Sequence, residues 1–477
     1  MLNVITDLWH SFVSIPHLGL YLAISWIGYL LWVGAWIVLQ KREPAATLSW
    51  LMGLAALPYV GFLIYHVFGP QRIKRHRLRR GRARDGLPAL TKATRDLEAI
   101  ELAKLGEATT GLPPSSASDV RLLIDGSAKY SALLADVAQA QEHIHLEYYI
   151  YCADQTGTAL RDALVERARA GVKVRVLLDA VGSGKVTREF MRPLTDAGGE
   201  LTWFHPMRFG RIWQRPWLNM RSHRKIVVID NRIAFTGGIN ITDEENDALR
   251  SDAYRDLHLR IEGDAVRSLQ AVFLEDWAYA NETRPLDINV SSIAPGPIPA
   301  QVLTSGPDSS WEAIHRLHVG AIHGAEKRVW LMTPYFVPGE AAMMALTSAA
   351  LGGVDVRLVV PKMSDSKLVT YAARSYYDLL LEAGVKVFEY GPRLMHSKAL
   401  LVDDDLALIG SANFDHRSFR LNFEVSMLFR DRGIAGQLAK LIEGEFANAA
   451  PVRNDRDRPL FRVRLPEALA RLLSPLL

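Results

Sequence analysis

The residues with the clearest chemical meaning form a pattern of His, Lys, Asp, Gly and Asn that occurs twice. The first copy reads HRKIVVIDNRIAFTGGIN and the second reads HSKALLVDDDLALIGSAN, with identical internal spacings. The two copies supply His223, Lys225, Asp230 and Asn240, and His396, Lys398, Asp403 and Asn413. A lone His-x-Lys pair is common, but a whole pattern at equivalent points of a repeat indicates a duplicated active site.

The chemistry that suits two such copies is exchange at a phosphodiester. In a strand, residues i and i+2 face the same side, so each histidine projects beside its lysine. One neutral imidazole can attack phosphorus to form a phosphohistidine, while a protonated one donates to the leaving oxygen. We expect His223 to be the nucleophile and His396 the acid, although symmetry leaves the two roles exchangeable.

Further groups are needed to hold the phosphoryl oxygens. Lys225 and Lys398 supply positive charge, and the amides of Asn240 and Asn413 are predicted to bind the phosphate beside them. The glycines before those asparagines are expected to let the backbone approach the phosphate closely.

A catalytic imidazole also needs a carboxylate that orients it and stabilises its charged form. Asp256 and Glu424 follow the two motifs in apolar, strand-like stretches, where an acid without a function is costly to bury. They are the predicted orienting groups. Asp230 and Asp403 belong to the candidate catalytic set as motif members, but their place at the far end of each strand favours a supporting role.

The elements that position these residues are also duplicated. AGVKVRVLLD at 170–179 returns as GGVDVRLVVP at 352–361, and AGGELTWFHP at 197–206 returns as AGVKVFEYGP at 383–392. Each half alternates apolar strands with helical stretches, which predicts an α/β architecture of two tandem α/β/α lobes with mixed, largely parallel sheets. We expect lobe 1 at 119–294 and lobe 2 at 295–477, with PGPIP at the seam.

The N-terminal part has a different character. Two uncharged runs predict helices at about 18–39 and 45–66, and each is long enough to cross a bilayer. They predict a transmembrane hairpin at 1–70, followed at 71–118 by a basic juxtamembrane segment and a Pro, Gly and Ser rich linker. Eight cations and no acid lie between Gln71 and Arg84, so the positive-inside rule places the catalytic part in the cytoplasm. The rest of the chain is mildly acidic, which disfavours a nucleic-acid partner.

The doubled HxK(x)4D(x)6G[GS]xN pattern resembles the phospholipase D superfamily over residues 120–477. LNMRSHRKIVVID, SANFDHRSFRLNFE, LPYVGFLIYHVFG and the terminal ARLLSPLL are similar to bacterial cardiolipin synthases. The resemblance implies an enzyme of the bacterial inner membrane that uses no metal or cofactor. It also implies that two phosphatidylglycerol molecules react through a phosphatidyl-histidine to give cardiolipin and glycerol.

Other functions stay open at this point. Phosphatidylethanolamine as donor, a lipid hydrolase and a nuclease would all use the same histidines. A non-catalytic lipid-binding scaffold is less consistent with two undamaged motifs.

Two segments bear on contact with lipid. An insert before His223 mixes arginine with tryptophan, as at a headgroup interface, and is a candidate for membrane contact and substrate entry through Arg208, Arg211, Trp213, Arg215 and Trp217. The terminal FRVRLPEALARLLSPLL has helical apolar spacing. It suits a membrane surface, but closing a core is the commoner use and is the expectation here.

Overall fold

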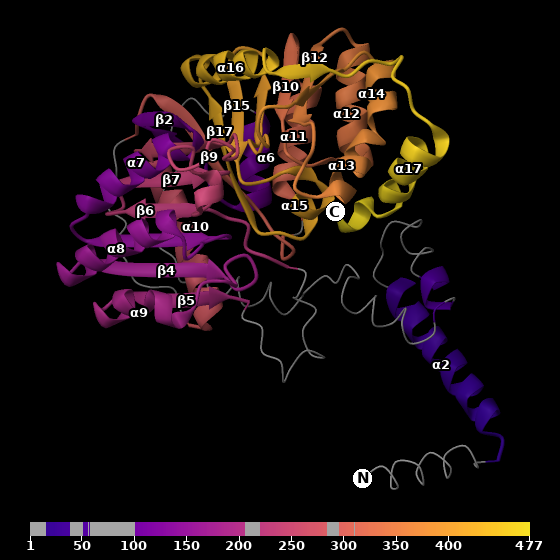
Figure 1. The fold of residues 1–477 in the computed structure, drawn as a ribbon, viewed down its shortest axis with the longest axis horizontal. Coiled ribbons are helices and arrows are strands. Elements are labelled where there is room, and N and C mark those ends of the chain that lie inside the picture. Colours follow the sequence, from indigo (N-terminus) through magenta and orange to yellow (C-terminus); the bar gives the residue numbers. More distant parts are fainter. Residues whose placement is uncertain are drawn as a thin grey trace. The chain divides into compact units, whose positions relative to one another are not determined.

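The computed structural model describes residues 16–38, 51–55, 57, 101–205, 220–283, 295–309 and 311–477. From residue 101 onwards they belong to one compact unit that contains two α/β lobes (Figure 1). Helix α2 (Leu18–Val38) and residues 51–55 belong to a separate unit. Within the described ranges, no helix combines the length and the hydropathy of a membrane span. The hairpin therefore stays a prediction, and the basic run at 71–84 lies outside the described residues.

Lobe 1 is a seven-stranded sheet with helices on both faces. In spatial order its strands are β2 (Asp119–Ile124), β8 (Leu257–Glu262), β7 (Ile233–Gly237), β6 (Ile226–Ile229), β3 (His143–Tyr148), β4 (Lys173–Asp179) and β5 (Glu200–Phe204). Its helices are α7 (Asp125–Ala138), α8 (Gln155–Arg169), α9 (Arg188–Asp196) and α10 (Ala265–Asn281). Side chains of β6 alternate between the core under α7 to α9 and the core under α10, as the period of two in a strand requires.

Lobe 2 repeats this plan around a nine-stranded sheet. In spatial order its strands are β1 (Ser115–Ala117), β9 (Ile298–Ser305), β17 (Glu424–Arg430), β15 (Leu406–Gly410), β14 (Ala399–Val402), β10 (Arg328–Met332), β12 (Asp355–Pro361), β13 (Lys386–Tyr390) and β18 (Ala449–Pro451). Its helices are α6 (Glu101–Thr110), α11 (Ala313–His323), α12 (Glu340–Leu351), α13 (Lys367–Arg374), α14 (Tyr377–Glu382), α15 (His416–Arg420), α16 (Arg432–Phe446) and α17 (Leu465–Leu472). A small ladder pairs β11 (Phe336–Val337) with β16 (Phe414–Asp415).

The two lobes share one hydrophobic core. Leu259 and Ile261 of β8 belong to the same buried cluster as Val425 and Met427 of β17. Helices α10 and α16 contribute apolar side chains to that cluster as well. The shared core fixes the two motifs relative to each other, because neither lobe can move without exposing apolar surface.

The sheets are mixed as predicted, but the expectation that they are largely parallel is wrong. Among the described strands of the two main sheets, the parallel pairs are those of β3, β4 and β5 in lobe 1 and of β10, β12 and β13 in lobe 2. The motif strands form tight hairpins, β6 with β7 and β14 with β15, and a short turn can join only antiparallel strands. The parallel part is the part that the strand–helix repeats predicted.

The segment before lobe 1 that is predicted to be a linker forms regular secondary structure in its described part. Residues up to Thr110 form α6, and Ser115–Ala117 form β1, which pairs antiparallel with β9 in the sheet of lobe 2. The chain therefore starts lobe 2 before it builds lobe 1. The sequence ELAKLGEA consists mostly of good helix formers, so it continues as a helix. The prediction of an irregular segment is therefore correct only for the Pro-rich part that follows.

Candidate active site

Each motif histidine lies just before a strand and is held there by backbone bonds to the other lobe. The amide of His223 donates to the carbonyl of Phe423 at 2.9 Å, and the amide of His396 donates to the carbonyl of Arg255 at 2.8 Å. Phe423 precedes Glu424, and Arg255 precedes Asp256. The cross-lobe backbone contacts therefore bring each histidine next to the acid of the opposite lobe.

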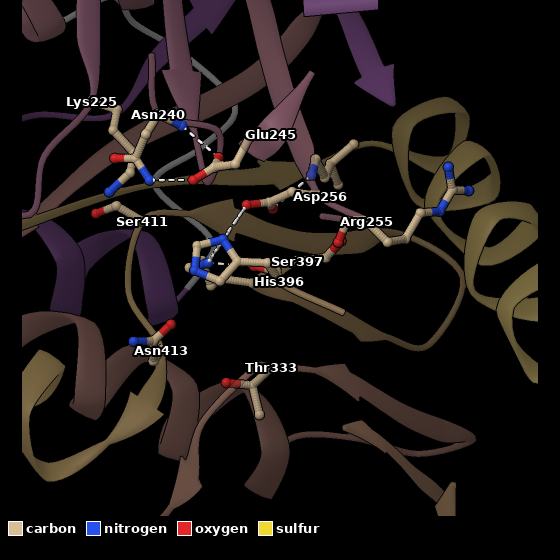
Figure 2. A network of polar contacts seen from close by, with 12 residues as sticks. Lys225, Asn240, Glu245, Arg255, Asp256, Thr333, His396, Ser397, Ser411 and Asn413 are labelled. Carbon is tan, nitrogen blue, oxygen red and sulfur yellow. Dashed lines mark hydrogen bonds and ion pairs between the residues drawn. The ribbon is translucent and has the colours of Figure 1, made fainter. Parts of the chain in front are cut away.

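The side chains of each histidine and the acid of the opposite lobe are in direct contact. Nδ1 of His223 lies 3.0 Å from Oε2 of Glu424, and Nδ1 of His396 lies 2.6 Å from Oδ2 of Asp256. Both carboxylates are almost fully buried, whereas the histidines keep 9% and 8% of their surface exposed. A carboxylate at Nδ1 fixes the ring orientation and leaves Nε2 as the reacting nitrogen. Figure 2 shows Asp256 directed at the His396 ring.

The lysines stand beside their histidines as the strand spacing predicts. Nζ of Lys225 donates to the carbonyl of His223 at 2.8 Å, and Nζ of Lys398 donates to the carbonyl of His396. Nζ of Lys398 also lies 2.9 Å from Nδ1 of His396 and 3.6 Å from Asp256. Because an ammonium has three N–H donors, Lys225 can still offer hydrogen bonds to an anion, whereas the donors of Lys398 already face His396 and Asp256.

Electrostatics suit a neutral ring at His223. Burial lowers the pKa of the His223 imidazole to about 4, with Glu424 opposing the shift and Lys225 adding to it. Burial also lowers the pKa of the Lys225 ammonium to about 8, against the opposing Glu424 carboxylate. For Glu424, burial acts to raise the pKa, but His223 and Lys225 together hold it below its usual value. Lys398 contributes to the shifts at both His223 and Lys225, so the two half-sites share one electrostatic centre.

The two asparagines are not equivalent. The backbone and side-chain amides of Asn240 both donate to Glu245 at 2.7 Å, and its Oδ1 accepts from Ile150 at 3.3 Å. Oδ1 of Asn413 is buried and has no hydrogen-bond partner among the described residues. The repeat position of Glu245 is Ser418, which accepts only the backbone amide of Asn413. Only the lobe 2 amide is therefore free to meet a substrate with its oxygen.

Glu245 is the functional residue that sequence reasoning missed. It is 2% exposed and lies beside the predicted site (Figure 2). Glu245, Asp256 and His396 each place one potential ligand atom within 4.8 Å of the others, the only such group among the described residues. These atoms already bind one another or Asn240, so the set reads as an internal hydrogen-bond network. A comparison of the two halves does not reveal Glu245, because serine replaces it in lobe 2.

The motif aspartates lie away from the histidines. Asp230 accepts the backbone amides of Gln141, Glu142 and His143 at 2.8 to 2.9 Å, and Asp403 accepts those of 326–328. These contacts favour the supporting role for both aspartates, and that role stays a prediction. They tie the turn after each motif strand to the start of the neighbouring strand.

The residue two positions before each asparagine packs against the orienting carboxylate of its own lobe. A Cβ at Gly238 would lie 2.2 Å from Oδ1 of Asp256, so only glycine fits there. In lobe 2 the same position is Ser411, whose hydroxyl donates to Glu424. Contact with the carboxylate explains these two residues, and the expected close approach of the neighbouring backbone to phosphate stays a prediction. The five candidate membrane-contact residues at 208–217 lie outside the described residues.

Comparison with known proteins agrees with this arrangement. Residues 133–277 and 319–448 match the family described as cardiolipin synthase, PLD-like domain, and residues 30–70 match the phospholipase D-nuclease N-terminal family. The chain is 41% identical over 461 residues to a cardiolipin synthase of Geobacillus thermodenitrificans, covering 92% of this chain and 91% of the relative. It is 39% identical over 473 residues to cardiolipin synthase 2 of Bacillus anthracis, covering 93% and 89%.

A solved structure shares the fold. The phosphatidylserine synthase of Haemophilus influenzae superposes with a TM-score of 0.61 at 14% identity, covering 79% of this chain and all of that one. The duplicated motif, the cross-lobe site and these matches lead to one conclusion: the chain belongs to the cardiolipin synthase family of phospholipase D-like proteins.

Proposed function

We propose that this protein is a cardiolipin synthase that transfers a phosphatidyl group from one phosphatidylglycerol to the headgroup of a second, releasing glycerol. The family matches support the reaction class. The observation that carries the proposal is the pair of imidazoles, each with its Nδ1 held by a carboxylate and each beside a buried lysine. This pairing supplies a nucleophile and an acid at one centre.

In the first step, Nε2 of His223 attacks phosphorus and a P–N bond forms. The bond between phosphorus and the headgroup oxygen of the donor breaks, and that oxygen takes the proton from Nε2 of His396 as glycerol departs. The low pKa of His223 supports this assignment, because its ring is then neutral at physiological pH. Glu424 accepts a hydrogen bond from the Nδ1–H group of His223 and stabilises the positive charge that develops on the ring.

In the second step, a headgroup hydroxyl of the acceptor lipid attacks the same phosphorus. Its proton passes to Nε2 of His396, the P–N bond breaks, and His223 returns to its neutral form. The product is cardiolipin, and the net reaction exchanges one phosphoester for another. Since the two esters are alike in energy, the reaction is reversible, and glycerol drives it backwards.

Lys225 and Lys398 are the groups proposed to hold the non-bridging oxygens. Lys225 uses one N–H on the carbonyl of His223 and keeps others for the phosphate. Lys398 also contacts Nδ1 of His396 and Asp256, so it is proposed to act mainly through its positive charge. Asn413 is the proposed amide partner of the substrate, because its Oδ1, unengaged among the described residues, can accept a hydrogen bond from a headgroup hydroxyl. Asn240 is assigned instead to the internal network with Glu245.

The N-terminal part is proposed to anchor the enzyme in the bacterial inner membrane through the hairpin at 1–70. The match of residues 30–70 to an N-terminal family and the absence of charged residues in α2 support this placement. The basic run at 71–84 favours a cytoplasmic catalytic part and attracts anionic lipid.

The test uses the full chain in vesicles of phosphatidylglycerol that is labelled separately in phosphate and in the headgroup. We expect phosphate label in cardiolipin and headgroup label divided equally between cardiolipin and free glycerol, with neither product in a His396→Ala control. Phosphatidic acid as the only labelled product would mean a hydrolase and would overturn the proposal. The same assay with labelled phosphatidylethanolamine shows whether a second donor is used.

A further inference from the structure

The C-terminal helix α17 exposes its leucines and buries Glu467 and Ala470 on its opposite side. The exposed fractions are 43% for Leu465, 55% for Leu469, 75% for Leu472 and 42% for Leu473. The residues buried on the other side are Glu467, Ala470 and Ser474. Both sets recur at the three- and four-residue spacing of one helix face, so the helix is amphipathic with its apolar face outward. The expectation that this stretch closes a core is wrong for these four leucines, although Ala470 and Leu477 do pack against the core of lobe 2.

Specific contacts hold the helix in this orientation. Glu467 forms an ion pair with Arg458, and Tyr376 donates to the hydroxyl of Ser474 at 2.9 Å. Arg471 lies over the ring of Tyr376 at 4.6 Å. Glu467 and Ser474 on the buried face are engaged in these contacts, and Ala470 between them packs in the core of lobe 2. A rotation that hides the leucines would therefore break these contacts and expose Ala470.

The exposed face continues into the segment before the helix. Leu460 is 56% exposed and Phe461 is 78% exposed, at the start of the single π turn at Leu460–Arg464. Large apolar side chains gathered in this way are uncommon on a surface that faces only water. They mark a surface that is covered in the working protein.

The charge beside this face indicates what covers it. Arg462 and Arg464 are exposed, and neither forms an ion pair within the described part of the chain. Leucine and phenylalanine flanked by free arginines match the boundary of an anionic bilayer, where chains bury in the acyl region and cations meet phosphate. We infer that the face formed by Leu460, Phe461, Leu465, Leu469, Leu472 and Leu473, the C-terminal apolar face, docks on the anionic lipid surface that holds the substrate.

The C-terminal apolar face is connected to the active site through α15. The carbonyl of Leu477 accepts the amide of Arg417 at 2.9 Å, so the chain ends against α15 (Figure 1). Helix α15 begins three residues after Asn413, the amide proposed to meet the substrate. The inference rests on the proposed lipid substrate, and docking here would hold lobe 2 against the bilayer beside the catalytic centre.

One test compares vesicles with dissolved substrate in the full-length enzyme. Leu469→Glu with Leu472→Glu should reduce turnover of phosphatidylglycerol vesicles by about tenfold, because charged groups replace apolar ones at the interface. Turnover of a monomeric short-chain phosphatidylglycerol should stay unchanged. Leu351→Glu is the matched control, since Leu351 is 74% exposed but lies at the end of α12. Unchanged vesicle turnover in the double variant would overturn the inference.

A second test reads the contact directly. With Cys152 replaced by Ala, Leu472→Cys carries an environment-sensitive fluorophore, and the protein is placed in vesicles that contain nitroxide-labelled phosphatidylglycerol. We expect a blue shift and quenching at position 472, and neither at a label on Ala170→Cys. An unquenched label at 472, or one that cross-links to a second copy or to another part of the chain, would contradict lipid docking. Failure of the unsubstituted enzyme to make short-chain cardiolipin would instead refute the proposed function.

Discussion

Nδ1 of His223, in lobe 1, lies 3.0 Å from Oε2 of Glu424, in lobe 2. The reverse pair, His396 of lobe 2 with Asp256 of lobe 1, is built in the same way at 2.6 Å. Each lobe therefore holds a histidine that the other lobe orients. A single lobe has no complete half-site, which ties the chemistry to the shared core between the two sheets.

Because Glu424 orients His223 and Asp256 orients His396, substitution of the two carboxylates is predicted to cause different kinetic defects. Glu424→Gln should slow the attack of His223 on any donor, by about 10²- to 10⁴-fold, as loss of an orienting carboxylate does elsewhere. Asp256→Asn acts on His396 as the acid of the first step, so it should slow that step only for donors with a poor leaving group. The measurement is the burst rate of leaving-group release, which reports the first step, from phosphatidylglycerol and from a phosphatidyl nitrophenol in both variants. Rescue of Glu424→Gln, and not of Asp256→Asn, by the nitrophenol would contradict the assignment.

The pKa of Lys225 predicts the alkaline side of the pH profile. Its ammonium is charged below about pH 8 and loses that charge as the pH rises through this value. We expect kcat/KM for short-chain phosphatidylglycerol to fall above about pH 8. Lys225→Arg should be slower but should carry its alkaline limb to higher pH, because a guanidinium stays charged. An alkaline limb at the same pH in Lys225→Arg would exclude Lys225 as its cause.

Asp230 should matter for stability and not for chemistry. Asp230→Ala removes the acceptor of three backbone amides and is expected to lower the free energy of unfolding by about 1–3 kcal/mol. Asp230→Asn keeps an acceptor oxygen and tolerates the positive φ of 52°, so it should lose less. Thermal unfolding and kcat, measured well below the melting temperature, separate the two effects. A large loss of kcat in a stable Asp230→Asn protein would restore a catalytic role.

Gly238 should be intolerant of a methyl group. In Gly238→Ala the new Cβ would overlap the Asp256 carboxylate, which must shift away from His396. We expect a loss of turnover with the same leaving-group dependence as Asp256→Asn. Gly436→Ala is the control, since a Cβ there meets nothing within 4 Å in α16. Turnover of Gly238→Ala equal to that control would show that the carboxylate has room to move.

Much of the active centre can be predicted because the duplicated motif is evident in the amino-acid sequence. The i, i+2 spacing of His223 and Lys225 predicts that they lie side by side, and they do so just before β6. The apolar stretch around Glu424 indicates that a buried acid needs a partner. The parallel strands follow from the strand–helix repeats. These features depend on local sequence periods, which a single chain displays.

The remaining features depend on contacts between distant segments. The pairing of His223 with Glu424 rather than Asp256 is set by backbone bonds between lobes, and no local pattern records them. Glu245 has no counterpart in lobe 2, so the repeat conceals it. The outward face of α17 is decided by Glu467 and its bond to Arg458, whereas its leucines alone read as a core face.

The most direct test of the central claim is to trap the covalent intermediate. In His396→Ala, a phosphatidyl nitrophenol with labelled phosphate needs no acid for departure, so a burst of nitrophenol should accompany label on the protein. Peptide mapping is predicted to find the label on His223, and His223→Ala should show neither burst nor label. Label on any other residue, or a full burst from His223→Ala, would contradict the account.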